Sequence, residues 1–233
     1  MKDLVSIIIP IHNPAKAENC IRAIQNQTYK NIEIIKIEFE GFPAEKRNYG
    51  LKLSKGDYVY FLDEDEYLTP TVVEECVNKA KEGYDIIAVP VIKKTAKSYV
   101  ANCIAIIRES TTKTMFFKRS VLDKIGPLDP RFILADDMEI LQRAIRAGFK
   151  VGTISSHLVH DEEVGFTDIM RKTMFARTSF RLLKSTYGKK TFNSIFRASF
   201  HRRRILKEIS KRPKYLPGVF LLMFVRFILR RMP

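Results

Sequence analysis

Residues 58–66 read YVYFLDEDE and decide the fold, because a run of five apolar side chains ends abruptly in four carboxylates. An apolar run without polar alternation is typical of a strand that is buried on both faces of a parallel sheet. Open α/β sheets bind their ligands where such strands end. Asp63 and Asp65 therefore predict a site for a divalent cation, which prefers carboxylate oxygens as ligands. The alternative is a solvated acidic turn.

Apolar runs of the same kind alternate with helical patterns along the chain. They predict three further strands and two helices, at residues 5–10, 32–39, 85–91, 15–27 and 44–53. Thr69 and Pro70 match the start of another helix, as its N-cap and its first residue. Residues 93–114 follow no clear pattern. Strands and helices that alternate at this spacing predict a doubly wound α/β fold.

Size and composition fit one compact domain with an appendage. The chain has 233 residues, of which 45% are hydrophobic, so it can bury a full core. Its three cysteines, Cys20, Cys76 and Cys103, form no C-x-x-C pair, which favours a reducing compartment over a disulfide framework. No stretch reaches the roughly 18 consecutive apolar residues that a membrane-spanning helix needs.

Charge is distributed unevenly along the chain. The net formal charge is +15, and from residue 171 onward 18 Lys and Arg residues stand against a single acid, Glu208. Residues 1–170 are therefore nearly neutral, which argues against a nucleic-acid groove across them. We predict a main domain at residues 1–170 and a basic helical extension at residues 171–233, with no nucleic-acid partner.

A second acidic group, Asp136 and Asp137, precedes apolar residues at helical spacing. Asp136 as N-cap and Glu139 three residues later resemble a capping box, and spacing alone favours that interpretation. A carboxylate at this helix start that faces a cleft would instead suit a general base. His160 lies among acids, where a surface ion pair is the ordinary interpretation and a metal ligand is the alternative.

Taken together and in this order, the motifs resemble those of glycosyltransferase family 2, whose fold is called GT-A. The resemblance covers about residues 4–165 and rests on seven segments: VSIIIPIHN (5–13), QTYKNIEII (27–35), RNYG (47–50), GDYVYFLDED (56–65), FKR (117–119), GPLD (126–129) and DDME (136–139). It implies a Rossmann-like, mixed but mainly parallel sheet flanked by helices, with residues 1–170 as the catalytic domain.

The resemblance also implies an inverting transfer from a nucleotide-sugar donor to an acceptor hydroxyl, assisted by Mg²⁺ or Mn²⁺. Asp137 would be the general base, and the cation would be held by Asp63, Asp65 and His160. Asp136 and Arg143 would lie on the acceptor side. The residues implied in donor binding are Pro10, His12, Asn13, Glu38, Arg47, Asp63 and Glu64.

Two features depart from the family pattern. The family often carries paired aspartates after its second strand, where this chain has Glu38 and Glu40, so UDP is favoured only by the weight of the family. The chain also lacks tryptophan and therefore the Q-x-x-R-W motif, which argues against a processive polysaccharide synthase.

The basic extension alternates apolar with basic residues at roughly helical spacing, which suits an anionic membrane surface. Residues 216–229 are strongly apolar but contain Arg226. As a helix they reach about 21 Å, short of the ~30 Å hydrocarbon core, so we expect them to lie in the interface. The alternative is a helical hairpin packed on the main domain with a solvated basic face.

We therefore expect a peripheral glycosyltransferase on the cytoplasmic face of a membrane, acting in glycan biosynthesis on a glycan or lipid-linked acceptor. One alternative is a sugar-phosphate nucleotidyltransferase, which usually carries a Gly-rich basic loop after the first strand; here that position reads HNPAK (12–16). The other is a non-catalytic binding module that has kept the fold.

Overall fold

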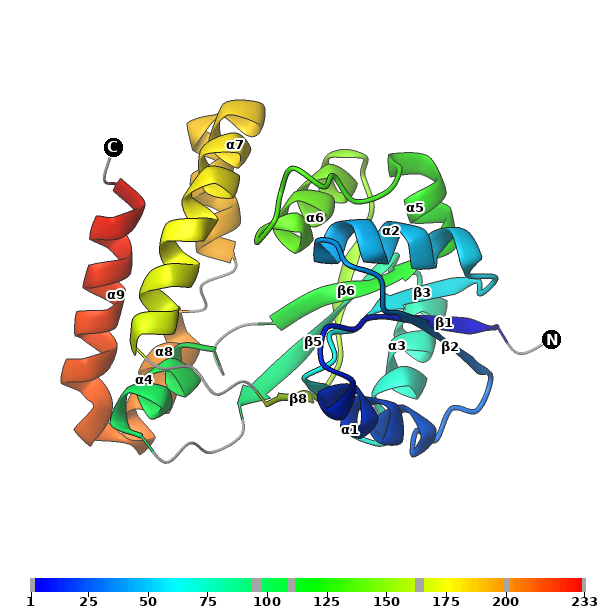
Figure 1. Cartoon of the computed structure of the whole chain (residues 1–233), viewed down its shortest axis with the longest axis horizontal. Helices are drawn as coiled ribbons and strands as arrows, with labels where there is room; N and C mark the ends of the chain where they lie inside the picture. Colours follow the sequence, from blue (N-terminus) through cyan, green and yellow to red (C-terminus); the bar gives the residue numbers. More distant parts are fainter. Residues whose placement is uncertain (1–2, 94–97, 109–111, 162–165, 199–201, 232–233) are drawn as a thin grey trace. The chain divides into compact units, whose positions relative to one another are not determined.

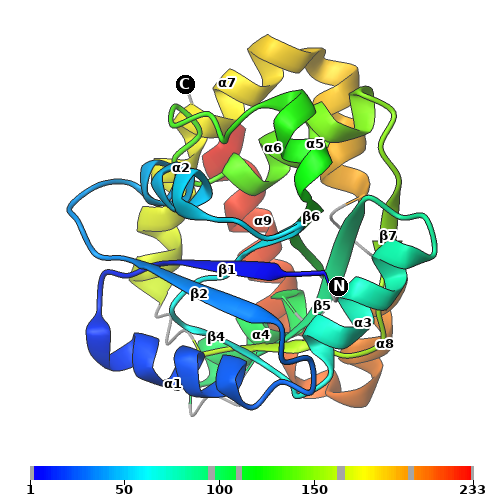
Figure 2. The ribbon, with the colours of Figure 1, turned by 90° about the vertical axis from the view of Figure 1, so that its right-hand side faces the viewer.

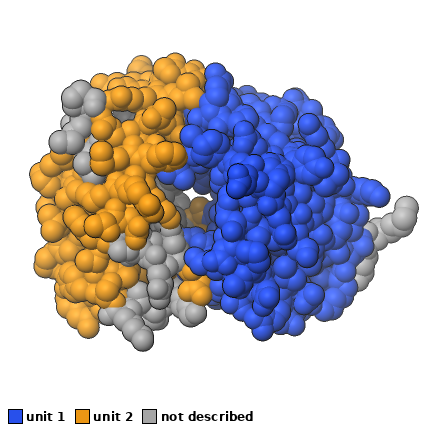
Figure 3. Space-filling view, viewed as in Figure 1, with its two compact units in different colours: residues 1–90, 113–160 blue, residues 91–112, 161–233 orange. Residues whose placement is uncertain are grey.

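The computed structural model describes residues 3–93, 98–108, 112–161, 166–198 and 202–231. The chain forms two compact units, coloured separately in Figure 3: unit 1 holds residues 1–90 and 113–160, and unit 2 holds residues 91–112 and 161–233. Residues 91–112, which include the last residues of the strand Ile86–Lys93, thus group with the C-terminal helices. The boundary near residue 170 stays a prediction of where the catalytic domain ends.

A mixed sheet with strand order β2-β1-β3-β6-β5-β8-β4 forms the centre of unit 1, and β7 pairs with β5. β1 pairs in parallel with β2 and β3, whereas β3 and β6 are antiparallel. The bounds are β1 Val5–Pro10, β2 Ile32–Ile37, β3 Tyr58–Phe61, β4 Glu66–Leu68, β5 Ile86–Lys93, β6 Thr112–Lys118, β7 Val151–Thr153 and β8 Leu158–His160. This confirms the predicted α/β fold with a mixed sheet.

Five helices of unit 1 cover the sheet. They are α1 Pro14–Gln25, α2 Pro43–Leu53, α3 Val72–Lys81, α5 Arg119–Ile125 and α6 Asp136–Arg146. Helices α2, α5 and α6 lie on one side and α1 and α3 on the other (Figures 1 and 2). Because both faces are covered, Ile7, Ile9 and Phe61 are fully buried, which explains why these strands read as continuous apolar runs.

The strand register brings several predicted residues to one end of the sheet. Ile8 on β1 pairs with Phe61 on β3, so the residues that follow the two strands emerge side by side. The short antiparallel pair of β4 and β8 places Glu66 opposite His160. The acidic run of residues 63–66 and His160, which are far apart in the sequence, therefore lie close together beyond the end of β3.

The helix predicted from Thr69 and Pro70 begins later than expected. Helix α3 starts at Val72 with Thr71 before it, so the assignment of Thr69 as N-cap is wrong. The backbone N–H and the hydroxyl of Thr69 both donate to the carbonyl of His157, at 3.2 and 2.8 Å. Thr69 therefore continues the edge contact of β4 with the segment before β8, and the helix begins only after that contact ends.

Unit 2 is helical wherever the structure describes it, apart from its share of β5 and β6. It contains α4 Tyr99–Arg108, α7 Phe166–Ala198, α8 Arg202–Lys211, the 3₁₀ helix η1 Pro213–Tyr215 and α9 Leu216–Arg231. Gly188, with φ of 80°, interrupts α7, which thus consists of two helical segments. Helix α9 packs on α4, and Cys103, Ile104, Val219 and Leu222 form part of their shared core.

Close packing between α4 and α9 depends on a glycine. A Cβ atom at Gly218 would lie 2.5 Å from the Cys103 sulfur and 2.6 Å from the Tyr99 ring. The Tyr99 hydroxyl also donates to the carbonyl of Lys214, at 3.0 Å. Within the described residues, no helix has the length and hydropathy needed to cross a bilayer.

Candidate active site

Arg47 lies at the centre of the candidate site. Its guanidinium donates through Nη2 to Asp63, just beyond β3, and through Nη1 to Asp136, the first residue of α6. Helix α2 carries Arg47 close to the sheet because Gly50 faces Ile8, where a Cβ atom would lie 2.4 Å from a methyl group. Burial by itself would lower the pKa of Arg47, but the two carboxylates outweigh burial and raise it. Arg47 is therefore a permanent buried cation between two acids.

Lys113 on β6 completes the charge balance around Asp63. Its ammonium group donates to Asp63 Oδ2 at 2.7 Å and to Glu66 Oε2 at 2.6 Å. Burial opposes ionisation of Asp63, yet Lys113 and Arg47 prevail and hold its pKa below the ordinary value. Burial raises the pKa of Glu66 to about 7, with Lys113 acting in the opposite direction. Both oxygens of Asp63 thus face cations.

Sequence reasoning assigned no role to Lys113 or Glu66. Glu66 stands in the acidic run of residues 63–66, but the D-x-D spacing drew attention to Asp63 and Asp65 instead. Lys113 lies in the stretch 93–114 that had no recognisable pattern. A single lysine before an apolar strand gives no signal that its ammonium group is buried between two acids.

Asp65 and His160 form the part of the site that suits a metal ion. Asp65 Oδ1 lies 3.5 Å from His160 Nε2, and the two side chains are only 19% and 12% exposed. In the part of the chain that the structure describes, no three His, Cys, Asp or Glu side chains converge as a metal site. A cation held by Asp65 and His160 would need further oxygen ligands, from Asp63 or from a bound molecule, as hard cations that coordinate substrate phosphates do.

Asp137 begins α6 beside Asp136. It is half-buried, and its Oδ1 accepts the N–H of Met138 at 2.8 Å. Burial, and next the charge of Asp136, raise the pKa of Asp137 to about 6. A carboxylate with a pKa near neutrality can exist in both protonation states under cellular conditions, which suits a general base.

The capping box expected at Asp136 is wrong. Helix α6 starts at Asp136 itself, its N-cap position is Ala135, and no side chain caps it. Asp136 binds Arg47 instead, and Glu139 binds Arg143 at 2.8 Å. Arg143 also donates to the carbonyls of Ile125 and Pro127 and so ties α6 to the end of α5.

The loop after β1 is held from two sides. Glu64 Oε2 accepts the backbone N–H groups of His12 and Asn13, at 2.7 and 2.8 Å. Lys46, only 1% exposed, donates to the carbonyl of Ile11 at 2.6 Å and lies 3.0 Å from His12 Nδ1. Because an ammonium group only donates, His12 Nδ1 accepts, and the neutral ring carries its proton on Nε2.

The remaining predicted donor residues occupy the ends of β1 and β2. Pro10 is the last residue of β1 and pairs with Ile37 of β2. Glu38 follows β2 directly and is exposed. Asn13 also caps α1, since its side-chain oxygen accepts the N–H of Ala15 at 3.1 Å. These positions border the loop that Glu64 and Lys46 hold.

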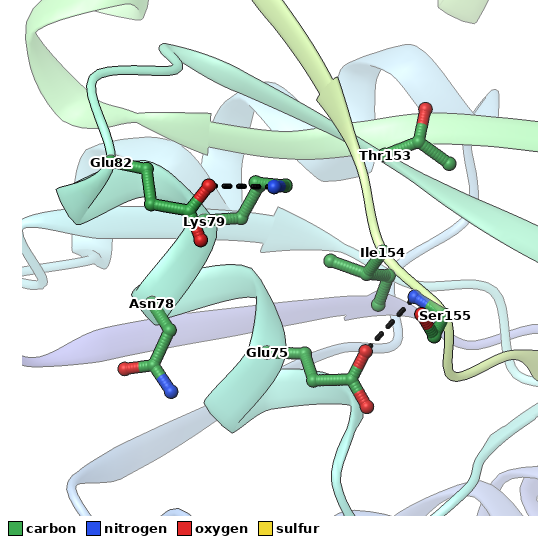
Figure 4. Close-up of a pocket in the computed structure, with 7 residues that line it drawn as sticks. All are labelled: Glu75, Asn78, Lys79, Glu82, Thr153, Ile154 and Ser155. Atoms are coloured by element: carbon green, nitrogen blue, oxygen red, sulfur yellow. Dashed lines mark hydrogen bonds and ion pairs between the residues drawn. The ribbon is translucent and has the colours of Figure 1, made fainter.

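A pocket on another part of unit 1 contains none of the predicted site residues (Figure 4). It has a volume of about 180 Å³ and is lined by Glu75, Asn78, Lys79, Glu82, Thr153, Ile154 and Ser155. Glu75 accepts the N–H of Ser155 at 3.0 Å, and Lys79 pairs with Glu82 at 2.6 Å. The volume is below the ~300 Å³ at which ligand pockets begin, and four of the seven lining residues are paired with one another.

Comparison with curated proteins gives relatives of one kind. Glycosyltransferase GlyG of Streptococcus pneumoniae is 26% identical over the matched region, which covers 35% of this chain and 36% of GlyG. The GalNAc(5)-diNAcBac-PP-undecaprenol beta-1,3-glucosyltransferase of Campylobacter jejuni is 28% identical over a region that covers 34% of this chain and 35% of that protein. The matched region thus spans about a third of the length of either relative.

The fold has a solved counterpart. Mannosyltransferase PcManGT from Pyrobaculum calidifontis, in complex with GDP-Man and Mn²⁺, aligns with a TM-score of 0.56 over 97% of this chain and 75% of its own, at 14% identity. At that identity the likeness concerns the fold alone. Residues 40–126, which carry Arg47 and the D-x-D motif, match the model of Glycosyl transferase family 2. Over this matched region the chain is therefore similar to glycosyltransferase family 2, and its fold is similar to that of GT-A glycosyltransferases.

Proposed function

We propose that this chain transfers a sugar from a nucleotide-sugar donor to an acceptor hydroxyl with inversion at the anomeric carbon. The observation that carries the proposal is the position of Arg47 between Asp63 and Asp136. This buried cation joins the carboxylates that follow β3, on the donor side, to the acidic pair that opens α6, on the acceptor side. The donor and the acceptor would then bind on either side of one ionic cluster, formed by Asp63, Arg47 and Asp136.

The donor half uses the loop after β1 and the D-x-D residues. Glu64 fixes the backbone of His12 and Asn13, so the loop needs little further ordering when a nucleotide binds. The Nε2–H of His12 and the exposed Glu38 would contact the nucleotide base. Asp63 would contact the ribose or the cation. Asp65 and His160 would hold Mg²⁺ or Mn²⁺. When bound there, the cation would act as a Lewis acid that neutralises charge on the leaving diphosphate.

The acceptor half uses Asp137 as general base. Its carboxylate would take the proton of the acceptor hydroxyl while that oxygen attacks the anomeric carbon from the face opposite the diphosphate. A pKa of about 6 leaves Asp137 mostly ionised at neutral pH and still basic enough to accept a proton. Asp136, bound to Arg47, holds the start of α6 in place, and Arg143 holds the segment 125–127 on the same side.

The acceptor we propose is a glycan or a lipid-linked glycan at the cytoplasmic face of a membrane. A relative whose name specifies an undecaprenol-linked substrate supports this class of acceptor. UDP is the first nucleotide to test. GDP is the second nucleotide to test, because the solved structure of PcManGT contains GDP-Man.

Calorimetric titration with UDP, GDP and dTDP, each with and without Mn²⁺, tests the donor half. We expect one nucleotide to bind tightly and only in the presence of the metal; no binding of any nucleotide would overturn the donor assignment. Incubation with the matching nucleotide sugar should then slowly release free sugar and nucleoside diphosphate. A nucleotidyltransferase would form or consume pyrophosphate, and a non-catalytic module would release nothing.

A further inference from the structure

Helix α9 of unit 2 presents an apolar face that its neighbours leave exposed. Leu216, Phe220, Phe224 and Phe227 follow one another at helical spacings of four, four and three residues and are 50%, 71%, 52% and 51% exposed. Leu221 and Ile228 flank this stripe and are 56% and 39% exposed. We call these six side chains the α9 face.

The opposite side of α9 is fixed by packing. Val219 and Leu222 are 1% and 4% exposed and lie in the core shared with α4. Gly218 sits against Cys103 and Tyr99 so closely that no side chain fits there. The helix is therefore unable to rotate and bury the α9 face without losing this core. Phe220, Phe224 and Phe227 therefore remain exposed when unit 2 is folded.

The charged residues of α9 and of the sequence beside it, residues 209–233, are all basic. Residues 209–233 contain six Lys and Arg residues and no Asp or Glu. Lys214 is exposed immediately before the helix, and Arg230 and Arg231 end it. The last acid before this segment, Glu208, pairs with Lys211 at 2.7 Å. Cations at both ends of an exposed apolar stripe match the boundary between acyl chains and anionic headgroups.

The length of α9 decides how it meets such a boundary. Its 16 residues make a helix of about 24 Å, shorter than the ~30 Å hydrocarbon core. One side is also committed to α4. A helix of this kind lies parallel to the membrane plane and inserts only its apolar face, as amphipathic interfacial helices do.

We propose that the α9 face is a membrane-docking surface for a bilayer that contains anionic lipids. Phe220, Phe224 and Phe227 insert among the acyl chains, and the flanking basic residues contact the headgroup phosphates. A second copy of this chain is the competing occupant, and it would bring two wholly cationic segments together, which like-charge repulsion disfavours. The inference does not rest on the proposed function, since docking requires neither donor nor acceptor.

The absence of tryptophan from the chain allows a direct test of insertion. Phe224→Trp places the protein's single indole on the α9 face. Phe175→Trp is the matched control, because Phe175 on α7 is 53% exposed and lies outside the face. On addition of vesicles of phosphatidylcholine and phosphatidylglycerol, the emission of the Phe224→Trp protein should shift to the blue and become protected from an aqueous quencher. The control should change little. Equal shifts for both would overturn the assignment to α9.

Sedimentation with vesicles tests the energetic role of the face. The triple variant Phe220→Ser, Phe224→Ser and Phe227→Ser should lose vesicle binding, at roughly tenfold in partition coefficient for each phenylalanine removed. The control variant Met174→Ser with Phe175→Ser should bind as the unaltered chain does. All the replaced side chains are exposed, so circular dichroism and thermal unfolding should remain unchanged and exclude misfolding.

Lipid composition and oligomeric state separate the remaining explanations. Binding should weaken on vesicles of phosphatidylcholine alone and as salt rises, because the headgroup contribution is electrostatic. Light scattering should give a monomer in the absence of vesicles. A dimer that the triple serine variant converts to monomer, with no vesicle binding, would assign the face to a second copy and overturn the proposal.

Discussion

The guanidinium of Arg47 donates a hydrogen bond to the carboxylate of Asp136, which lies 89 residues later in the chain. The same guanidinium also binds Asp63. One buried side chain on α2 thereby joins the end of β3 to the start of α6. Removal of either acid alone would leave Arg47 with one partner, whereas removal of Arg47 would deprive both acids of their shared cation and leave Asp63 with Lys113.

Replacement of Arg47 by methionine should destabilise unit 1 by about 3–5 kcal/mol at pH 7, because the buried carboxylate of Asp136 loses this cation and the half-buried Asp63 keeps only Lys113. The difference should shrink in acid. Asp63, whose folded pKa lies below its ordinary value of 3.8, contributes stability that is present at pH 7 and is lost as the pH falls below about 4. Urea unfolding of both proteins at several pH values measures this.

The matched control is Arg131→Met. Arg131 also binds a carboxylate, Asp129, at 2.6 Å, but its side chain is 69% exposed. An exposed ion pair contributes about 0–1 kcal/mol, so this variant should unfold close to the unaltered protein. Equal losses for Arg47 and Arg131 would show that burial of the Arg47 pair carries no special weight.

The sequence was sufficient for those parts of the site that follow a local pattern. The apolar run of residues 58–62 predicts β3, and the carboxylates after it predict where Asp63 and Asp65 emerge. Strands β4 and β8 are three residues each, too short for a periodic signal. The approach of His160 to Asp65, which the pairing of β4 and β8 sets up, is therefore expected only from the family resemblance.

Long-range charge pairs could not be predicted from spacing. The residues next to Asp136 in the sequence are the same whether its carboxylate caps a helix or binds a distant arginine. Asp136 binds Arg47 only because the tertiary packing of α2 brings the guanidinium to it. The contacts of Lys113 could not be predicted for the same reason, since a lone lysine usually lies on the solvated surface. The sequence also could not predict which side of α9 is exposed, because the pattern of apolar residues does not distinguish buried from exposed phenylalanines on one helix.

A double-mutant cycle tests the pair of Lys113 and Glu66. Lys113→Met should cost about 2–4 kcal/mol, because Glu66, only 3% exposed, loses its cation. Lys113→Met combined with Glu66→Leu should recover part of that loss, with a coupling energy of about 1–3 kcal/mol. Additive losses in urea unfolding would contradict a direct interaction between these two side chains.

Asp65→Asn and His160→Asn should weaken Mn²⁺-dependent nucleotide binding about 10–100-fold each, since two protein ligands leave little redundancy. Calorimetry with and without Mn²⁺ separates the effect on the metal from an effect on the nucleotide itself. Asp129→Asn, a change of the same kind at an acid bound to Arg131, serves as the control. Unaltered metal dependence in the Asp65 and His160 variants would remove both residues from the proposed site.

Asp137→Asn should strongly suppress transfer and at the same time stabilise the fold. The pKa of Asp137 is about 6 in the folded protein, above its ordinary 3.8. The folded state therefore binds more protons between pH 3.8 and 6, and the contribution of Asp137 to stability falls as pH rises through that window. Asparagine removes the ionised form and retains an oxygen for the N–H of Met138, so stability at pH 7 should rise by about 1–2 kcal/mol.

The same group sets the pH dependence of transfer. In the unaltered protein kcat/KM should fall below about pH 6, because the base becomes protonated. The Asp137→Asn variant should lose about 10²–10⁴-fold in kcat, which is the usual contribution of a general base, with donor affinity nearly unchanged. Loss of stability together with loss of donor binding would instead identify Asp137 as a structural residue at the start of α6. Normal turnover would leave the reaction without the base proposed for it.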